Sequence, residues 1–252
     1  MTRGRLGRYA VYQLGDYAIE RGLLLALLLA FLAWGNVFSS RMLMGPGWAA
    51  GVEGQIRAAT LFDSLLTLLG YAGALLGVNG ISSNDRQRGR FRLLFSRPIR
   101  VDAYYAQSFL VIGFGLLVVT ALVTAGFSTM VAPQSMVGAI SSVALCWMVV
   151  GGLGFLLSAI TRFDGSLLLL LMLVAALLNG YLGAAGTVGA KVHWLLTPLR
   201  YLLPPMHLLG DARGTLMQGL AVGGRELAWM IGFGAICVVA GLVVLRRRPL
   251  AT

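Results

Sequence analysis

The length of its uncharged runs is the feature that most limits how this chain can fold. Arg21 and Arg41 enclose 19 uncharged residues, and Asp63 and Asp85 enclose 21. A helix needs about 20 apolar residues to cross the hydrocarbon core of a bilayer. Because backbone amides inside the bilayer must be paired within the protein, such runs must be helices. We therefore expect an all-α integral membrane protein.

Further uncharged runs raise the expected number of spans to six. The 59 uncharged residues 103–161 suffice for two helices, which Pro133 separates because proline cannot continue a helix. Only 12% of the residues are charged, about half of the fraction in soluble domains. Within a single transmembrane domain over 1–252, the expected spans are 22–40, 61–81, 104–131, 136–160, 166–187 and 227–245.

Basic residues are distributed unequally between the two sides of such a bundle. Six spans place both termini on one side. That side carries 14 of the 20 basic residues, and the other side carries 6. Cytoplasmic loops are enriched in arginine and lysine, so both termini and the loop 82–103 are expected in the cytoplasm. Orientation therefore explains the net charge of +11 without nucleic acid as a partner.

Residues 5–21 have the pattern of a short amphipathic helix. At helical pitch, Leu6 and Leu14 share one face, opposite Arg5 and Asp16. A helix of this kind lies in the membrane interface. The alternative is a longer first span with a solvated start. The candidate interfacial residues are Arg5, Arg8, Tyr9, Tyr12 and Asp16.

Residues 191–226, the outer segment, are expected on the side opposite the termini. Their apolar stretches contain only 8 and 10 residues between charges, and prolines interrupt them repeatedly. We expect broken, interfacial or re-entrant helices here. His193 and His207 both lie in this segment, but without a nearby Cys or Glu they are favoured as solvated or capping residues over a metal pair.

Few polar groups fall inside the expected spans. Asp63 either pairs with Arg57 at the interface or lines a vestibule, and the structural role is favoured. Asn36, Asn79 and Asn179 are expected to form hydrogen bonds between helices. Small residues let helix backbones approach closely, and cysteines in apolar runs are expected in the core. The residues concerned are Gly73, Gly77, Gly151, Gly152, Gly154, Gly180, Gly183, Cys146 and Cys237.

Motifs for catalysis and nucleotide binding are absent from the sequence. It has no G-x-x-x-x-G-K-[ST] loop for ATP phosphates, no H-E-x-x-H and no G-x-S-x-G. Nine acidic residues and two histidines leave few candidates for acid–base catalysis. We expect neither catalytic residues nor a cofactor or metal site in this chain.

The loop 82–103 is strongly basic and partly apolar. Gly89, which permits a sharp turn, lies among arginines and precedes four large apolar side chains, Phe91, Leu93, Leu94 and Phe95. Two interpretations stay open. Either the apolar side chains enter the bilayer while the arginines meet anionic membrane lipid, or a short helix seats them in a groove of a cytoplasmic partner.

The stretch "NDRQRGRFRLLFSRPIRVDAYYAQSFL" resembles the permease subunits of type-2 ATP-binding-cassette (ABC) exporters. That family commonly has an acidic–basic cluster, a glycine, a leucine-rich turn, then a proline before the third span. Asp85, Gly89, Leu93, Leu94, Ser96 and Pro98 occupy these places. The stretch "LLSAITRFDGSLLLLL" is similar to the family's junction of spans four and five, and the order of the elements is similar over nearly the whole chain.

The resemblance implies a transport subunit, not an enzyme, in the plasma (inner) membrane of a bacterium. Two permeases, identical copies or paralogues, would assemble with two copies of a cytoplasmic ABC ATPase that binds ATP and magnesium. The loop would couple to this ATPase through Asp85, Arg86, Arg88, Gly89, Phe91, Leu93, Leu94, Phe95 and Pro98. The outer segment would form a gate that includes Trp194, Pro198, Tyr201, Pro204 and Pro205.

Two other functions stay open. One is a membrane enzyme that acts on lipid, with Asp63, His193 and His207 as its candidate residues. The other is a scaffold or mechanical transmitter that acts on an extracytoplasmic partner. For a transporter, the nearly uncharged interior favours lipids or amphipathic molecules over small ions as substrate.

Overall fold

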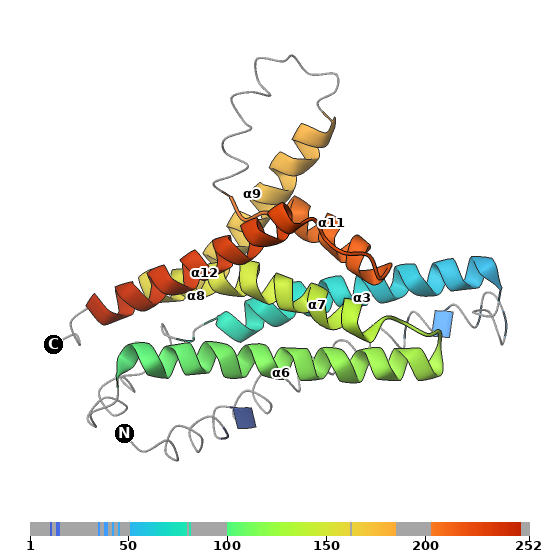
Figure 1. Ribbon diagram of the computed structural model, residues 1–252, viewed down its shortest axis with the longest axis horizontal. Coiled ribbons are helices and arrows are strands. Elements are labelled where there is room, and N and C mark those ends of the chain that lie inside the picture. The colour runs from blue at the N-terminus through green and yellow to red at the C-terminus, as the bar shows by residue number, and fades with distance from the viewer. Residues whose placement is uncertain are drawn as a thin grey trace.

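The computed structural model describes residues 51–79, 81, 100–161, 163–184 and 203–247, and positions 11, 14, 15, 35, 38, 39, 42 and 45. Every regular element within these residues is a helix, which confirms the predicted all-α class (Figure 1). The elements are α3 (Val52–Val78), α6 (Val101–Met130), α7 (Met136–Cys146), η3 (Trp147–Gly151), α8 (Gly152–Ile160), α9 (Asp164–Ala184), α11 (Met206–Met217) and α12 (Gly224–Arg247).

Five helices in the described part of the chain are long and apolar enough to cross a membrane. They are α3, α6, the central helix Met136–Ile160 formed by α7, η3 and α8, α9 as far as Tyr181, and α12. The chain is therefore a multi-pass membrane protein. Apart from a few isolated positions, the predicted first span 22–40 and the interfacial helix 5–21 lie outside the described residues.

Four described helices, α3, α6, α9 and α12, begin before their predicted spans because charged residues continue them. α3 begins at Val52, before the expected start at 61, and includes Glu53 and Arg57 in its first turns. α12 begins at Gly224 and continues through Arg247. The predicted bounds followed the uncharged runs, but a helix can leave the hydrocarbon core and continue where its charged side chains are solvated.

The turn between α6 and α7 lies where Pro133 was expected to separate two spans. α6 ends at Met130, and α7 begins at Met136 after five residues of turn and extended backbone. Ser135 caps α7, because its Oγ accepts a hydrogen bond of 3.1 Å from the amide of Gly138. α6 and the central helix thus form an antiparallel hairpin (Figure 1).

The central helix is the most enclosed of the spanning helices. Inside the described bundle, 78% of its span is buried, compared with 17% for α9 and 22% for α12. α3 and α6 pack against it, α11 packs mainly on α7, and α12 packs mainly on α8 and η3. The two halves of the central helix therefore have different neighbours, and the outer faces of α9 and α12 remain exposed and apolar.

A π-helical turn, η3, joins these two halves. Trp147 at its start is buried, and its ring stacks on Phe109 of α6 with the ring centroids 4.8 Å apart. Gly77 of α3 leaves space for the same ring, because a Cβ at that position would lie 2.9 Å from it. Gly113 of α6 does so as well. Single π turns occur frequently at functional positions in long helices.

The predicted close contacts at small residues are confirmed at most of these glycines. A Cβ on Gly152 would lie 2.8 Å from the carbonyl oxygen of Gly234, so α8 and α12 approach each other backbone to backbone. The prediction is wrong for Gly180, where a Cβ would meet no described atom within 4 Å. Cys146 and Cys237 are both buried, as expected.

Candidate functional site

Most residues that the resemblance singled out lie outside the part of the chain that the structure describes. This applies to all nine coupling residues between Asp85 and Pro98, to the five interfacial residues between Arg5 and Asp16, and to Trp194, Pro198 and Tyr201 of the gate. Pro204 and Pro205 are described. Both are buried, and they immediately precede α11, as proline before a helix commonly does.

An ion pair joins α11 to the N-terminal half of α3. Nε of Arg213 donates to Oδ1 of Asp63 at 2.6 Å, and Nη2 donates to Oδ2 at 3.1 Å. The arginine side chain is 21% exposed and the carboxylate 43% exposed. Two parallel charge-assisted hydrogen bonds fix both the distance and the orientation of the pair. We expected Arg57 as the partner of Asp63. In the structure, the partner of Asp63 is Arg213, which lies 150 positions further along the chain.

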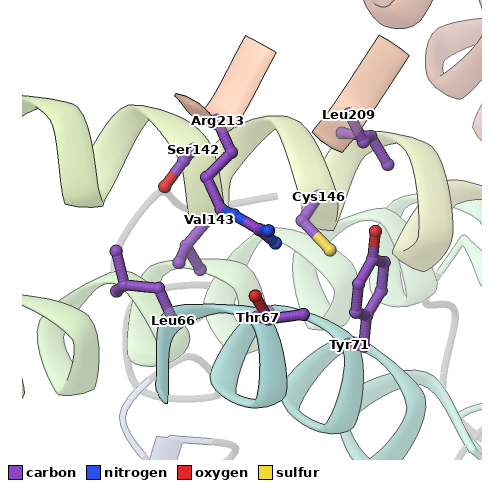
Figure 2. A pocket seen from close by; sticks show the side chains of 9 residues that line it. Leu66, Thr67, Tyr71, Ser142, Val143, Cys146, Leu209 and Arg213 are labelled. Atoms are coloured by element: carbon purple, nitrogen blue, oxygen red, sulfur yellow. The ribbon is translucent and has the colours of Figure 1, made fainter. Parts of the chain in front are cut away.

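Arg213 reaches this partner through the space between α3, α7 and α11. Figure 2 shows its side chain descending from α11 between Val143 and Cys146 of α7 and Thr67 of α3. The cavity beside it measures about 10 Å³, roughly the room that one water molecule needs. Apolar side chains and the stem of Arg213 fill the rest of the space, so α11 is held by both packing and charge.

The Asp63–Arg213 ion pair and its surroundings offer few groups for general acid–base or metal chemistry. Both oxygens of Asp63 accept hydrogen bonds from Arg213. Cys146 is buried against Gly70, with its Sγ 3.1 Å from the place of a Cβ there. Within the described residues, no three His, Cys, Asp or Glu side chains gather in a way that could hold a metal ion. His193 lies outside those residues. The Asp63–Arg213 pair is instead suited to holding α11 against α3 and to letting it separate.

A larger groove begins on the other side of Tyr71, whose side chain lines both spaces. This groove has a volume of about 500 Å³, within the range of small-molecule sites. Its walls come from three elements: Tyr71 of α3, Met206 and His207 of α11, and Leu169, Met172, Leu173, Ala176 and Asn179 of α9. The groove was not predicted, since no charged or motif-bearing residue marks it in the sequence.

Of the three asparagines expected to bridge helices, Asn36 lies outside the described residues, and the other two behave differently. Nδ2 of Asn179 donates to the carbonyl oxygen of Ala175 at 2.8 Å, within its own helix, so the expected bond between helices is wrong for this group. Asn79 follows the last turn of α3 and lies against α9, where a Cβ on Gly165 would be 3.0 Å from its Oδ1. Asn79 therefore lies at a contact between two helices, and the hydrogen bond expected there stays a prediction.

Charged residues of the described part of the chain lie near both ends of the loop 82–103, which was predicted to be cytoplasmic. Arg100, its last arginine, donates to Asp102 at 2.6 Å at the start of α6, and this hydrogen bond raises the pKa of Arg100 further above its ordinary value. Asp164 is buried at the start of α9, where a helix N-terminus favours a negative charge. The start of α9 lies beside the C-terminal end of α3, because Asp164 lines the same pocket as Leu76 and Asn79. This end of α3 leads into the loop.

The fold and these contacts define a multi-pass α-helical membrane protein in which, among the described residues, an ion pair joins the short helix α11 to the spanning helix α3. Comparison with protein-family models and with curated proteins gives no match for this sequence.

Proposed function

We propose that this chain is the transmembrane permease subunit of an ATP-driven exporter of the type-2 ABC class, with ATP hydrolysis on a separate subunit. Two permeases would form the substrate path, and two ATPase subunits would drive it. The absence of a phosphate-binding loop and the resemblance around Asp85–Pro98 support this proposal. The excess of arginine supports an orientation with both termini and the loop 82–103 in the cytoplasm of a bacterium.

The observation that carries the proposal is the Asp63–Arg213 ion pair. A permease needs an outer closure that can open and close, and α11 is fastened to α3 by one bidentate pair beside apolar packing. When α11 moves away, water can replace both hydrogen-bond partners, so separation costs far less than the loss of a buried apolar core. In this proposal the Asp63–Arg213 pair holds α11 against α3 while the outer gate is closed, and we call this pair the latch. Tyr71 lines both the cavity beside the latch and the groove.

The arrangement of the helix ends supports the proposed coupling. The C-terminal end of α3, the start of α6 and the C-terminal end of α12 lie at one end of the bundle, and α11 lies away from it (Figure 1). A push on the loop between α3 and α6 would reach α11 through α3 itself. The π turn at Trp147–Gly151 lies between the part of the central helix that contacts α11 and the part that contacts α12.

Copurification and a substitution in the loop test this proposal. We expect a nucleotide-binding protein to elute with the tagged chain at equal stoichiometry from mild detergent. The double variant Phe91→Asp/Leu94→Asp should insert normally but lose both the bound protein and ATP-dependent transport, because the apolar side chains can no longer enter a groove. The control Phe91→Leu/Leu94→Met keeps apolar side chains and should keep both. A chain that purifies alone, or one whose transport survives the two aspartates, would overturn the proposal.

A further inference from the structure

The groove between α3, α9 and α11 is lined by the side chain of Asn179, a polar residue in an apolar helix. Oδ1 of Asn179 is buried and has no hydrogen-bond partner among the described residues. A buried acceptor without a partner costs about 1–3 kcal/mol, so such atoms usually face a water molecule or a ligand. All other groove residues except Tyr71 and His207 are apolar.

The orientation of the Asn179 amide follows from its other hydrogen bond. Nδ2 donates to the carbonyl oxygen of Ala175 at 2.8 Å. A flipped amide would place Oδ1 against that carbonyl oxygen, where two acceptors would repel each other and the bond would be lost. The amide is therefore fixed with its oxygen as the open group. A ligand that completes this site must donate a hydrogen bond.

The groove adjoins the exposed apolar face of α9. Leu169 and Leu173 line it and are 52% and 56% exposed, respectively, on a helix whose apolar outer face continues through Leu177. No Lys, Arg, Asp or Glu lines the groove in the described residues. A cationic head group would therefore lose its hydration without gaining an anionic partner, and an anionic head group would meet no lysine or arginine. An uncharged head group on an apolar chain fits these walls.

We propose that this groove binds a neutral amphipathic lipid with an apolar chain and a hydroxyl head group, which donates to Oδ1 of Asn179. The ligand enters sideways from the bilayer past Leu169 and Leu173. Tyr71 separates it from the cavity of Arg213, so an occupied groove presses on the same residue that lines the latch. The inference rests on the proposed function only for the fate of the ligand, which would be the exported substrate. Its binding needs no ATPase.

Photolabelling of the purified chain alone tests the binding. The probes are a long-chain alcohol with a diazirine in its chain and the methyl ether of the same alcohol, which cannot donate a hydrogen bond. We expect the alcohol to label the peptides that contain Met172 and Met206 about twofold to tenfold more than the ether does. The variant Asn179→Leu should reduce alcohol labelling to the level of the ether.

Two further variants separate the loss of the acceptor from a general disturbance. Asn179→Thr retains a hydroxyl that can donate to the carbonyl oxygen of Ala175 and still accept from a ligand, so it should retain preferential labelling by the alcohol. Leu177→Ala, on the exposed face of the same helix and outside the groove, should label as the wild type does. Equal labelling by alcohol and ether in the wild type would mean that water satisfies Asn179, and the inference would be wrong. Labelling confined to other helices would overturn it as well.

These outcomes are independent of the test of the proposed function. A chain that binds the alcohol through Asn179 but elutes without an ATPase has a lipid site and is not the proposed exporter subunit. A chain that elutes with an ATPase but shows no preference for the alcohol is an exporter subunit with a different substrate site.

Discussion

Removal of the charge at Asp63 should release α11 more than removal of the charge at Arg213. In Asp63→Asn, the guanidinium of Arg213 remains largely buried and loses its anionic partner. Breaking a well-formed charge pair around a mostly buried group costs about 2 kcal/mol, less than for a fully buried pair because Asp63 is 43% exposed. The equilibrium between fastened and released α11 should shift by about 30-fold.

The reverse change should have a smaller effect. Arg213→Met keeps the apolar stem in its cavity and leaves the Asp63 carboxylate, which can be hydrated because it is 43% exposed. We expect a cost of about 1 kcal/mol, equivalent to a shift of about fivefold. The double variant should resemble the milder single variant, since Arg213→Met removes the stranded charge that makes Asp63→Asn costly.

Cysteine labelling can measure this release directly. Leu209 of α11 is 5% exposed and lines the cavity beside Arg213, so a cysteine there becomes accessible only when α11 lifts. The reporter is the variant Leu209→Cys, with Cys146→Ala and Cys237→Ala to remove the native thiols. We expect maleimide to label this cysteine faster when Arg213→Met is added, and fastest when Asp63→Asn is added. Equal rates in all variants would refute the role of the pair as a latch. Strictly additive effects in the double variant would refute the stranded-charge explanation.

Two further predictions concern packing in the bundle. Gly152→Ala should lower the thermal unfolding temperature, at a cost of about 1–3 kcal/mol, because its Cβ would meet the backbone of Gly234, whereas Gly180→Ala should be neutral or stabilising. A wild-type-like Gly152→Ala would contradict the close approach of α8 and α12. Trp147→Ala should cost about 3–5 kcal/mol through the cavity that it leaves beside Phe109, and Phe114→Ala, on an exposed face, should cost much less in the same melting measurement.

The spans could be predicted because the bilayer imposes a strong and simple rule on sequence. Every described spanning helix overlaps a run that was chosen by the absence of charge, and Pro133 marked the turn between α6 and α7. The ends of α3 were less predictable, because hydropathy reports the depth of the hydrocarbon core and not the last hydrogen bond of a helix. The contacts of Gly73 and Gly77 followed from the preference for small residues where helices meet.

The site could not be predicted because its members are joined only by the tertiary fold. Arg213 was assigned to the outer segment by its position, and nothing in its neighbours pointed to Asp63. The groove depends on the angle at which α9 and α11 meet, which one sequence does not specify. Asn179 did stand out as a polar residue in an apolar span, but its local bond to Ala175 is a common alternative to a bond between helices.

The most direct test of an ATP-driven permease is the labelling rate of the Leu209→Cys variant in native membranes, with and without magnesium and ATP. The account predicts that ATP changes this rate, and that Phe91→Asp/Leu94→Asp abolishes the change while leaving the basal rate as it was. A labelling rate that is the same with and without ATP, in membranes that contain the intact assembly, would contradict the claim that a separate ATPase opens this bundle.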